Sequence, residues 1–274
     1  FLVVATDTMH NHVHSHMMKR LSTDEHAFVT DATGRYAQIN LQGPKSRELL
    51  QSLTSCDLGD FPFRHASEID IGLARILCIR ITYVGELGYE LFIPVEQALH
   101  VYDRILSKGE EYGLCHAGLS ALGSLRMEKG YRDYGHDMDN TDTLLECCLG
   151  FTSDFDKQEG FIGQEHVLAQ KAFTRAQGGL TKRMANVLVN DPLPLVCHGE
   201  VLWRNGERIS DIRSASYGHT LGGAVGLTML ESDEEPITKD YLKSGEWQIE
   251  IANERYPCSV SFAPFYDPKN TKIK

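Results

Sequence analysis

The pattern of the sequence changes near residues 177–179, and this change constrains the fold more strongly than any other feature. Before it, segments with helical periodicity alternate with segments in which every second residue is apolar. After it, the chain contains only short strand-like runs, as a small β-barrel or a β-sandwich requires. The sequence therefore predicts an α+β domain over residues 1–177, incomplete at its N-terminus, followed by a small C-terminal β-barrel domain over residues 178–274.

Asn205 and Gly206 lie between two of the strand-like runs of the second part. A type I′ turn needs positive φ at both of its central positions, and Asn followed by Gly is the pair that adopts this conformation most easily. The pair therefore predicts a two-residue hairpin within the barrel domain.

The first part shows a strand and a helix joined by a short turn. Apolar residues alternate over residues 37–41, and Pro44 suits the first position of a helix. Two further strands are expected around a turn within residues 75–95, and Gly109 is expected to end the helix that follows them. The helices predicted after these strands cover residues 95–108, 119–130 and 159–172.

Four histidines, His10, His12, His14 and His16, alternate near the start of the chain. On a strand they would share one face, and on a helix they would form two pairs spaced by four residues, so either arrangement allows a set of metal ligands. The surrounding residues favour a helix that follows a short buried strand over residues 1–5 and a capping turn over residues 6–11. No Cys, Asp or Glu stands at ligand spacing within the run. We therefore expect a solvated helix face and no metal site.

The charge and the cysteines exclude several classes of protein. The net charge is −11, from 27 Lys and Arg against 38 Asp and Glu, which argues against nucleic acid as a partner. No apolar run is long enough to span a membrane. The seven cysteines form no C-x-x-C pair and their number is odd, which predicts reduced thiols in a cytosol-like or matrix-like compartment. Because the chain starts inside a strand-like segment, we also expect it to be the later part of a longer protein.

The segment "YVGELGYE" brings a phenol and a carboxylate within seven residues of each other. If Glu86 and Leu87 form a two-residue turn, Tyr83 and Glu90 become cross-strand neighbours. A carboxylate accepts two parallel hydrogen bonds from a guanidine-like edge, such as that of arginine or of a pterin ring. The alternative is an exposed edge pair without a ligand.

Six segments occur in an order that resembles the tetrahydrofolate-binding family of the glycine-cleavage T-protein. They are "LQGPKSRELL", "YVGELGYELFIP", "SLRMEKGYRDYGHDM", "GFIGQEHV", "VLWRNGE" and "APFYDPKN". Within the family, the chain most resembles the folate-binding C-terminal part of sarcosine dehydrogenase, and dimethylglycine dehydrogenase is a near neighbour. The resemblance covers nearly the whole chain.

The resemblance implies α+β folate-binding lobes, here with the N-terminal lobe truncated, and a β-barrel around a central channel. It implies that Tyr83 and Glu90 hold the pterin of tetrahydrofolate. Arg126, Lys129 and Arg132 are further candidates for folate binding, although the end of a helix also favours such cations through its dipole. The family's catalytic Asp lies in the lobe that precedes this sequence, so no catalytic residue is expected here.

The resemblance also implies a role in one-carbon metabolism. An upstream domain would hold FAD and oxidise a small N-methyl amine, and this chain would capture the one-carbon unit as methylene-tetrahydrofolate. It would be the folate-binding part of an oxidoreductase, in contact with the flavin domain, located in the mitochondrial matrix in a eukaryote and otherwise in the cytoplasm. No G-x-G-x-x-G phosphate loop occurs within the chain itself.

Two other functions remain open. T-proteins carry an Arg at the position of Leu122, which disfavours a free-standing aminomethyltransferase. A non-catalytic regulatory subunit, such as that of pyruvate dehydrogenase phosphatase, has the same architecture. The presence of Tyr83 and Glu90 speaks weakly against that reading.

Overall fold

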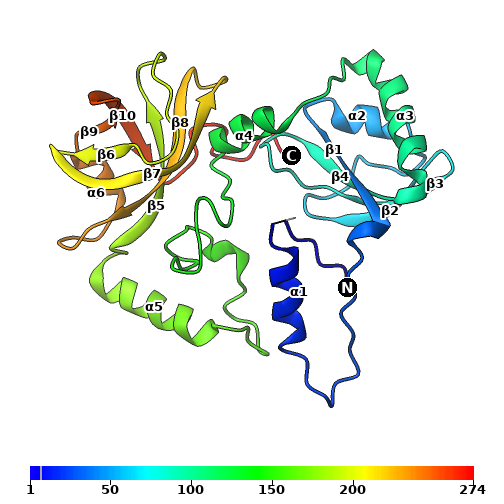
Figure 1. Ribbon diagram of the computed structural model, residues 1–274, viewed down its shortest axis with the longest axis horizontal. Helices are drawn as coiled ribbons and strands as arrows, with labels where there is room; N and C mark the ends of the chain where they lie inside the picture. The colour runs from blue at the N-terminus through cyan, green and yellow to red at the C-terminus, as the bar shows by residue number, and fades with distance from the viewer. Residues whose placement is uncertain (7) are drawn as a thin grey trace. The chain divides into compact units, whose positions relative to one another are not determined.

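The computed structural model describes residues 1–6 and 8–274, which form two compact units (Figure 1). Unit 1 contains Phe1–Leu41, Lys45–Ile81 and Gly88–Leu114. Unit 2 contains Gln42–Pro44, Thr82–Leu87 and Cys115–Lys274. Residues 115–177 therefore group with the barrel, and the domain boundary proposed at residues 177–178 lies inside unit 2.

Unit 1 is a four-stranded sheet with helices over one face. The strands lie in the order β1-β4-β3-β2. The elements of the unit are α1 (His10–Met18), η1 (Thr33–Arg35), β1 (Tyr36–Gln42), α2 (Ser46–Gln51), β2 (Ala66–Ile71), β3 (Ala74–Ile79), β4 (Gly88–Pro94), η2 (Val95–Gln97), α3 (Ala98–Gly109) and η3 (Glu110–Tyr112).

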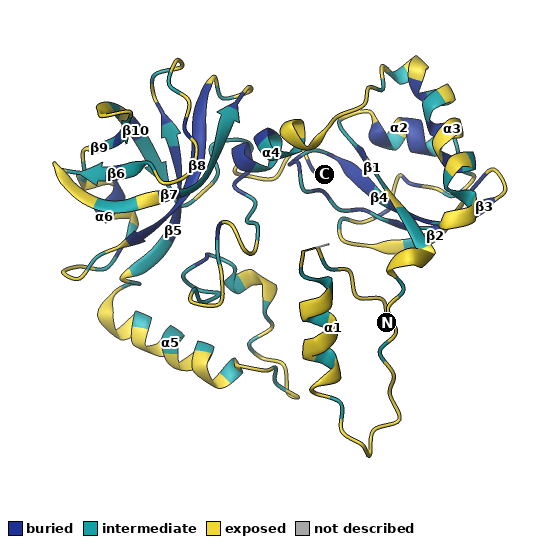
Figure 2. Ribbon diagram, viewed as in Figure 1, coloured by how far each residue is buried: buried dark blue, intermediate teal, exposed yellow. Residues whose placement is uncertain are grey.

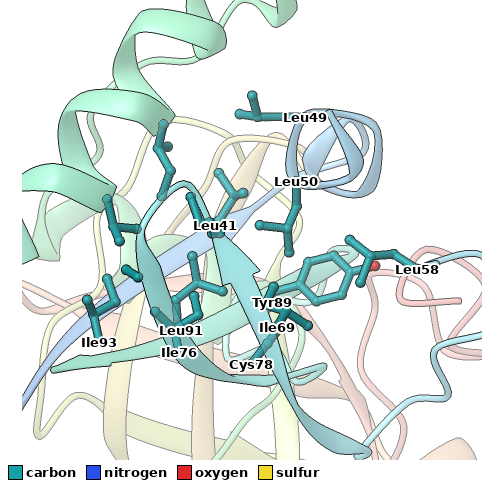
Figure 3. Packing of buried hydrophobic residues seen from close by; sticks show 14 of the residues in the cluster. Leu41, Leu49, Leu50, Leu58, Ile69, Ile76, Cys78, Tyr89, Leu91 and Ile93 are labelled. Atoms are coloured by element: carbon teal, nitrogen blue, oxygen red, sulfur yellow. The ribbon is translucent and has the colours of Figure 1, made fainter. Parts of the chain in front are cut away.

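The core of unit 1 lies between the sheet and the helices α2 and α3. Tyr89, Leu91 and Ile93 alternate along β4 and are 0 % exposed, and they pack with Leu49 and Leu50 of α2 (Figure 3). The side chains between them along β4 therefore face away from these helices, because successive residues of a strand point to opposite faces.

Unit 2 contains the barrel, which closes in the order β10-β5-β8-β7-β6-β9. Its strands β5 and β8 are the most completely buried elements of this unit (Figure 2). The elements are α4 (Leu119–Glu128), η4 (Gly150–Thr152), α5 (Gln164–Gln177), β5 (Lys182–Val189), β6 (Val201–Arg204), β7 (Glu207–Gly218), β8 (Gly223–Glu231), α6 (Lys239–Ser244), β9 (Trp247–Ile251) and β10 (Glu254–Ser261).

The barrel has apolar side chains on both sides of its wall. Leu202, Ile212 and Ile249 belong to the cluster that fills the barrel. A second cluster joins Met127 of α4 to Met184 of β5 and to Val225, Leu227 and Met229 of β8. The helix α4 is thus packed against the barrel by buried side chains, and this fixes the segment that follows it.

Most of the predicted elements are confirmed, including the closed barrel and the helices α2 to α5. The hairpin turn is confirmed in detail: Arg204 pairs with Glu207, and φ is 53° at Asn205 and 84° at Gly206. The helix α3 ends at Gly109, as predicted, and a 3-10 turn over Glu110–Tyr112 follows it before Gly113, which has φ of 73°.

Two predictions near the start of the chain are wrong. Residues 1–6 form no strand, and Phe1 to Val4 are exposed, because no strand of the described residues pairs with them. Pro44 is not the first residue of a helix, since α2 begins two residues later at Ser46. The turn predicted before α1 includes residue 7, which lies outside the described residues.

The histidine run forms the helix α1, as predicted. His12, His14 and His16 are exposed, and no residue of this helix is buried. Among the described residues, no group of three or more His, Cys, Asp and Glu side chains is placed to hold a metal ion. All seven cysteines lie within the described ranges and are free. No helix of the described chain combines the length and hydropathy needed to cross a membrane.

Candidate folate site

The connection between β3 and β4 differs from the predicted hairpin. Ile79 pairs with Glu90, and Cys78 pairs with Leu91. The predicted register, in which Tyr83 lies opposite Glu90, is therefore wrong. The connection is a longer loop over residues 80–87, and its residues 82–87 belong to unit 2. A two-residue turn is not formed, and residues of this loop instead contact segments that lie far away in the sequence.

Glu90 lies on the face of β4 opposite the core helices, because its neighbours Tyr89 and Leu91 point into the core. It is half-buried and forms a hydrogen bond with the side chain of Gln38, which lies on β1. No ion pair of Glu90 is present among the described residues. Burial raises the pKa of this carboxyl above its ordinary value, and the hydrogen bond from Gln38 offsets part of the shift.

Tyr83 is held in the loop by two consecutive residues of the segment after α4. Its ring stacks on that of Tyr131, with centroids 5.8 Å apart and an interplanar angle of 11°. Its hydroxyl donates to the carbonyl oxygen of Arg132 at 3.1 Å. Burial raises the pKa of Tyr83 to about 12, so this hydroxyl is protonated at neutral pH.

The remainder of the loop is fixed by the end of α4 and by the C-terminal segment. Gly85 has φ of 77°, and a Cβ there would lie 2.9 Å from Cγ of Lys129. Tyr266 donates a hydrogen bond to the carboxylate of Glu86. Glycine is therefore required at position 85 both for its conformation and for the space that Lys129 occupies.

Lys129 is buried and has an internal partner. Its Nζ lies 2.9 Å from Oδ2 and 2.6 Å from the carbonyl oxygen of Asp267, and the two side chains are 1 % and 5 % exposed. Burial alone would raise the pKa of Asp267, but hydrogen bonds from Lys129, Thr271 and Lys272 outweigh it and hold the pKa well below its ordinary value. The charge of Lys129 is thus neutralised within the chain.

Arg126 is also engaged internally. Its Nη1 lies 2.5 Å from Oδ2 of Asp137, whose side chain is 0 % exposed, and it donates to the carbonyl oxygen of Tyr131 at 3.2 Å. Arg132 donates to the carbonyl oxygen of Gly130 at 2.6 Å, and its Nε is buried with no hydrogen-bond partner among the described residues. Both guanidinium groups help to shape the segment after α4.

Four of the five predicted site residues thus meet in unit 2, namely Tyr83, Arg126, Lys129 and Arg132, while Glu90 lies in unit 1. Four residues around these side chains were not predicted from the sequence, namely Tyr131, Asp137, Asp267 and Gln38. The first three occur inside the segments "GYRDYGHDM" and "YDPKN", so their presence in these motifs was a usable signal. Gln38 carries no such signal.

Two family models match the chain in sequence. The GCVT N-terminal domain matches residues 1–157, and the glycine cleavage T-protein C-terminal barrel domain matches residues 182–267. The first match alone covers more than half of the chain. The chain belongs to the glycine-cleavage T-protein family, and its α+β fold with a closed C-terminal barrel agrees with that assignment.

Three proteins that are similar in sequence are much longer than this chain. The 4-methylaminobutanoate oxidase (formaldehyde-forming) of Paenarthrobacter nicotinovorans is 37 % identical over 94 % of this chain and 30 % of its own length. The mitochondrial pyruvate dehydrogenase phosphatase regulatory subunit of Mus musculus is 32 % identical, and the match covers 99 % of this chain and 32 % of the subunit's own length. Mitochondrial sarcosine dehydrogenase of Mus musculus is 31 % identical, and the match covers 90 % of this chain and 26 % of the dehydrogenase. The chain thus spans about a third or less of these relatives.

A solved structure shows the same fold. The glycine cleavage system aminomethyltransferase T from Bartonella henselae superposes with a TM-score of 0.73 at 21 % sequence identity, covering 95 % of this chain and 67 % of the other. This similarity supports the T-protein fold, including the barrel.

Proposed function

We propose that this chain binds reduced folate and forms the one-carbon-capturing part of a demethylating flavoenzyme of the sarcosine or dimethylglycine dehydrogenase type. The observation that carries the proposal is Glu90. Its carboxylate is half-buried and lies on the sheet face away from the core helices, and within the described part of the chain the amide of Gln38 is its one hydrogen-bond partner. A carboxylate can accept more hydrogen bonds than the one from Gln38, and the amino group and ring N–H of a pterin are a matching pair of donors.

The proposal assigns the pterin to Glu90 of unit 1, and Tyr83 of unit 2 is a separate candidate for contact with folate. Because Arg126 and Lys129 are neutralised by Asp137 and Asp267, neither is retained as a partner of the folate tail. Arg132 remains a candidate, since its Nε has no hydrogen-bond partner among the described residues and it forms no ion pair there.

Bound reduced folate supplies the nucleophilic amine that takes up the one-carbon unit. The chain's contribution is to bind and orient, because holding two reactants in the correct geometry is by itself a large part of catalysis. We assign no side chain of the described residues to proton transfer or covalent chemistry. The flavin and the N-methyl amine would be held by another part of the full protein.

Two features favour this function over the alternatives. The 4-methylaminobutanoate oxidase (formaldehyde-forming) and sarcosine dehydrogenase are both similar to the chain over at least 90 % of its length. Leu122, half-buried on α4, replaces the Arg that the resemblance to T-proteins leads one to expect. The regulatory-subunit alternative is favoured by a similarity that covers 99 % of the chain. A folate-binding assay separates the regulatory subunit from the two enzymatic functions, because only the regulatory subunit would not need folate.

Calorimetry with a reduced folate tests the proposal. Glu90→Gln keeps the size of the side chain but places a donor opposite the donors of the pterin. A charge-assisted contact of this kind contributes about 1.5–3 kcal/mol, so affinity should fall by roughly one to two orders of magnitude. Glu68→Gln on β2, where the exposed Glu68 pairs with Arg75, is the matched control and should leave affinity unchanged. Equal binding by wild type and Glu90→Gln would place the site elsewhere, and no binding by wild type would contradict the function.

A further inference from the structure

The segment after α4 is folded around the buried carboxylate of Asp137. Its Oδ2 accepts hydrogen bonds from Arg126 at 2.5 Å and from the backbone N–H of Asp133 at 2.6 Å. Its own backbone N–H donates to the carbonyl oxygen of Asp133 at 2.9 Å, and its carbonyl oxygen accepts from Arg213 at 2.9 Å. Asp137 thus closes the turn over residues 133–137 and ties it both to α4 and to the barrel strand β7.

Arg126 extends this network to Tyr131. Its Nη1, which is paired with Asp137, donates also to the carbonyl oxygen of Tyr131 at 3.2 Å, and the Tyr131 N–H donates to the carbonyl oxygen of Arg126 at 3.0 Å. Tyr131 supplies the ring that stacks on Tyr83, and Arg132 supplies the carbonyl that accepts the Tyr83 hydroxyl. Both contacts of Tyr83 therefore come from a backbone segment that Arg126 and Asp137 hold.

We infer that Asp137 is a positioning residue for Tyr83, acting through Arg126 and the backbone of Tyr131 and Arg132. The charges of Arg126 and Asp137 both act on the hydroxyl of Tyr83, in addition to the larger effect of burial. All of these residues belong to unit 2. The expected effect of Asp137 on folate affinity rests on the proposed function. The positioning of the Tyr83 ring by Asp137 does not rest on it.

The unused oxygen of Asp137 allows its charge to be separated from its hydrogen bonds. Oδ1 is buried and has no hydrogen-bond partner among the described residues. Asparagine can place its amide nitrogen there and keep its oxygen toward Arg126 and the Asp133 N–H, so Asp137→Asn removes the charge and keeps both hydrogen bonds. Asp137→Ala removes the acceptor as well. Leu202→Ala, at a fully buried barrel position, is the control for general destabilisation of the same unit.

The first readout is the aromatic ¹³C–¹H resonance of Tyr83, assigned by its absence in Tyr83→Phe. A ring stacked on Tyr131 experiences a ring-current shift that depends on its placement and not on global stability. We expect this resonance to move toward that of an unstacked tyrosine in Asp137→Ala, to move less in Asp137→Asn, and to stay in place in Leu202→Ala. If Asp137→Ala does not fold, Arg126→Gln replaces it, because it removes the same link to Tyr131.

The second readout is the affinity for reduced folate in two backgrounds. We expect Asp137→Ala to weaken binding about tenfold when Tyr83 is present and less than about twofold in Tyr83→Ala, which lacks the ring, because the effect passes through Tyr83. An unmoved Tyr83 resonance in the folded variant, or equal losses of affinity in both backgrounds, would overturn the inference. A wild-type chain that binds no folate contradicts the proposed function but leaves the resonance test decisive for Asp137.

Discussion

Glu90, the binding residue of the proposed function, shows how such a group can cost stability. Burial raises the pKa of its carboxyl, and no cation pairs with it among the described residues, so its ionised form is less stable in the folded chain than in the unfolded chain. Stability from this group is present below the unfolded pKa and is lost as pH rises through the folded pKa. We expect Glu90→Gln to raise the urea midpoint at pH 7 while it weakens folate binding. A lower midpoint would show that Glu90 stabilises the sheet.

Lys129 and Asp267 form the opposite case, a buried pair whose charges satisfy each other. Removing one partner leaves the other charge buried and unpaired, so Asp267→Asn should destabilise the chain by about 3–5 kcal/mol. Removing both charges, as in Lys129→Met with Asp267→Asn, should cost much less, because Asn keeps an acceptor for Thr271 and suits the φ of 41° at this position. Denaturant unfolding of the two variants tests this, and equal losses of stability would mean that the attraction between the two charges is unimportant.

The hairpin between β6 and β7 shows how the same substitution has opposite effects in two elements. Gly206 has φ of 84° and open space around its Cα, so Gly206→Ala adds only backbone strain and should cost about 1 kcal/mol. Gly123 lies inside α4, without positive φ and with equal space, so Gly123→Ala should stabilise by about 0.5–1 kcal/mol. Thermal unfolding compares the two, and effects of the same sign would contradict the argument.

The β6–β7 turn could be predicted from the sequence and the β3–β4 connection could not, because only the first is determined by its own residues. Asn205 and Gly206 carry the type I′ turn in their own backbone preferences, so a local pattern sufficed. The loop before β4 is shaped by the stacking of Tyr83 on Tyr131 and by the space that Lys129 takes beside Gly85. Since these contacts join segments more than 40 residues apart, the local spacing of Tyr83 and Glu90 suggested the wrong register.

At the scale of the whole molecule, the sequence predicted the type of each part better than the partners of its charges. The barrel follows from strand patterns that are local to each segment, so it was predictable. The cation of Lys129 is neutralised by Asp267, which lies 138 residues further along the chain. Without the three-dimensional fold, Lys129 resembled a free anion-binding group, and the same holds for Arg126 before its pairing with Asp137 is known.

Acid sensitivity should be strong in unit 2, because two buried acids with lowered pKa, Asp142 and Asp267, lie there. The side chain of Asp142 is 0 % exposed, and its oxygens lie 2.8 Å from Nζ of Lys182 and 2.5 Å from Nη1 of Arg213. Burial alone would raise its pKa, but the hydrogen bonds from Arg213 and Lys182 outweigh it and lower the pKa to about 2.

A carboxyl with a lowered folded pKa stabilises the chain above its unfolded pKa, which for Asp142 is 3.8, and this stability is lost as pH falls from about 4 to 2. The loss from Asp142 alone is about 2 kcal/mol. Both tryptophans, Trp203 and Trp247, lie in the barrel, so their fluorescence reports the unfolding of unit 2. The urea midpoint of this signal should fall steeply below pH 4, and Asp142→Asn should flatten that dependence while lowering stability at pH 7. A wild-type midpoint that stays constant between pH 5 and pH 2.5 would contradict the role assigned to these ion pairs.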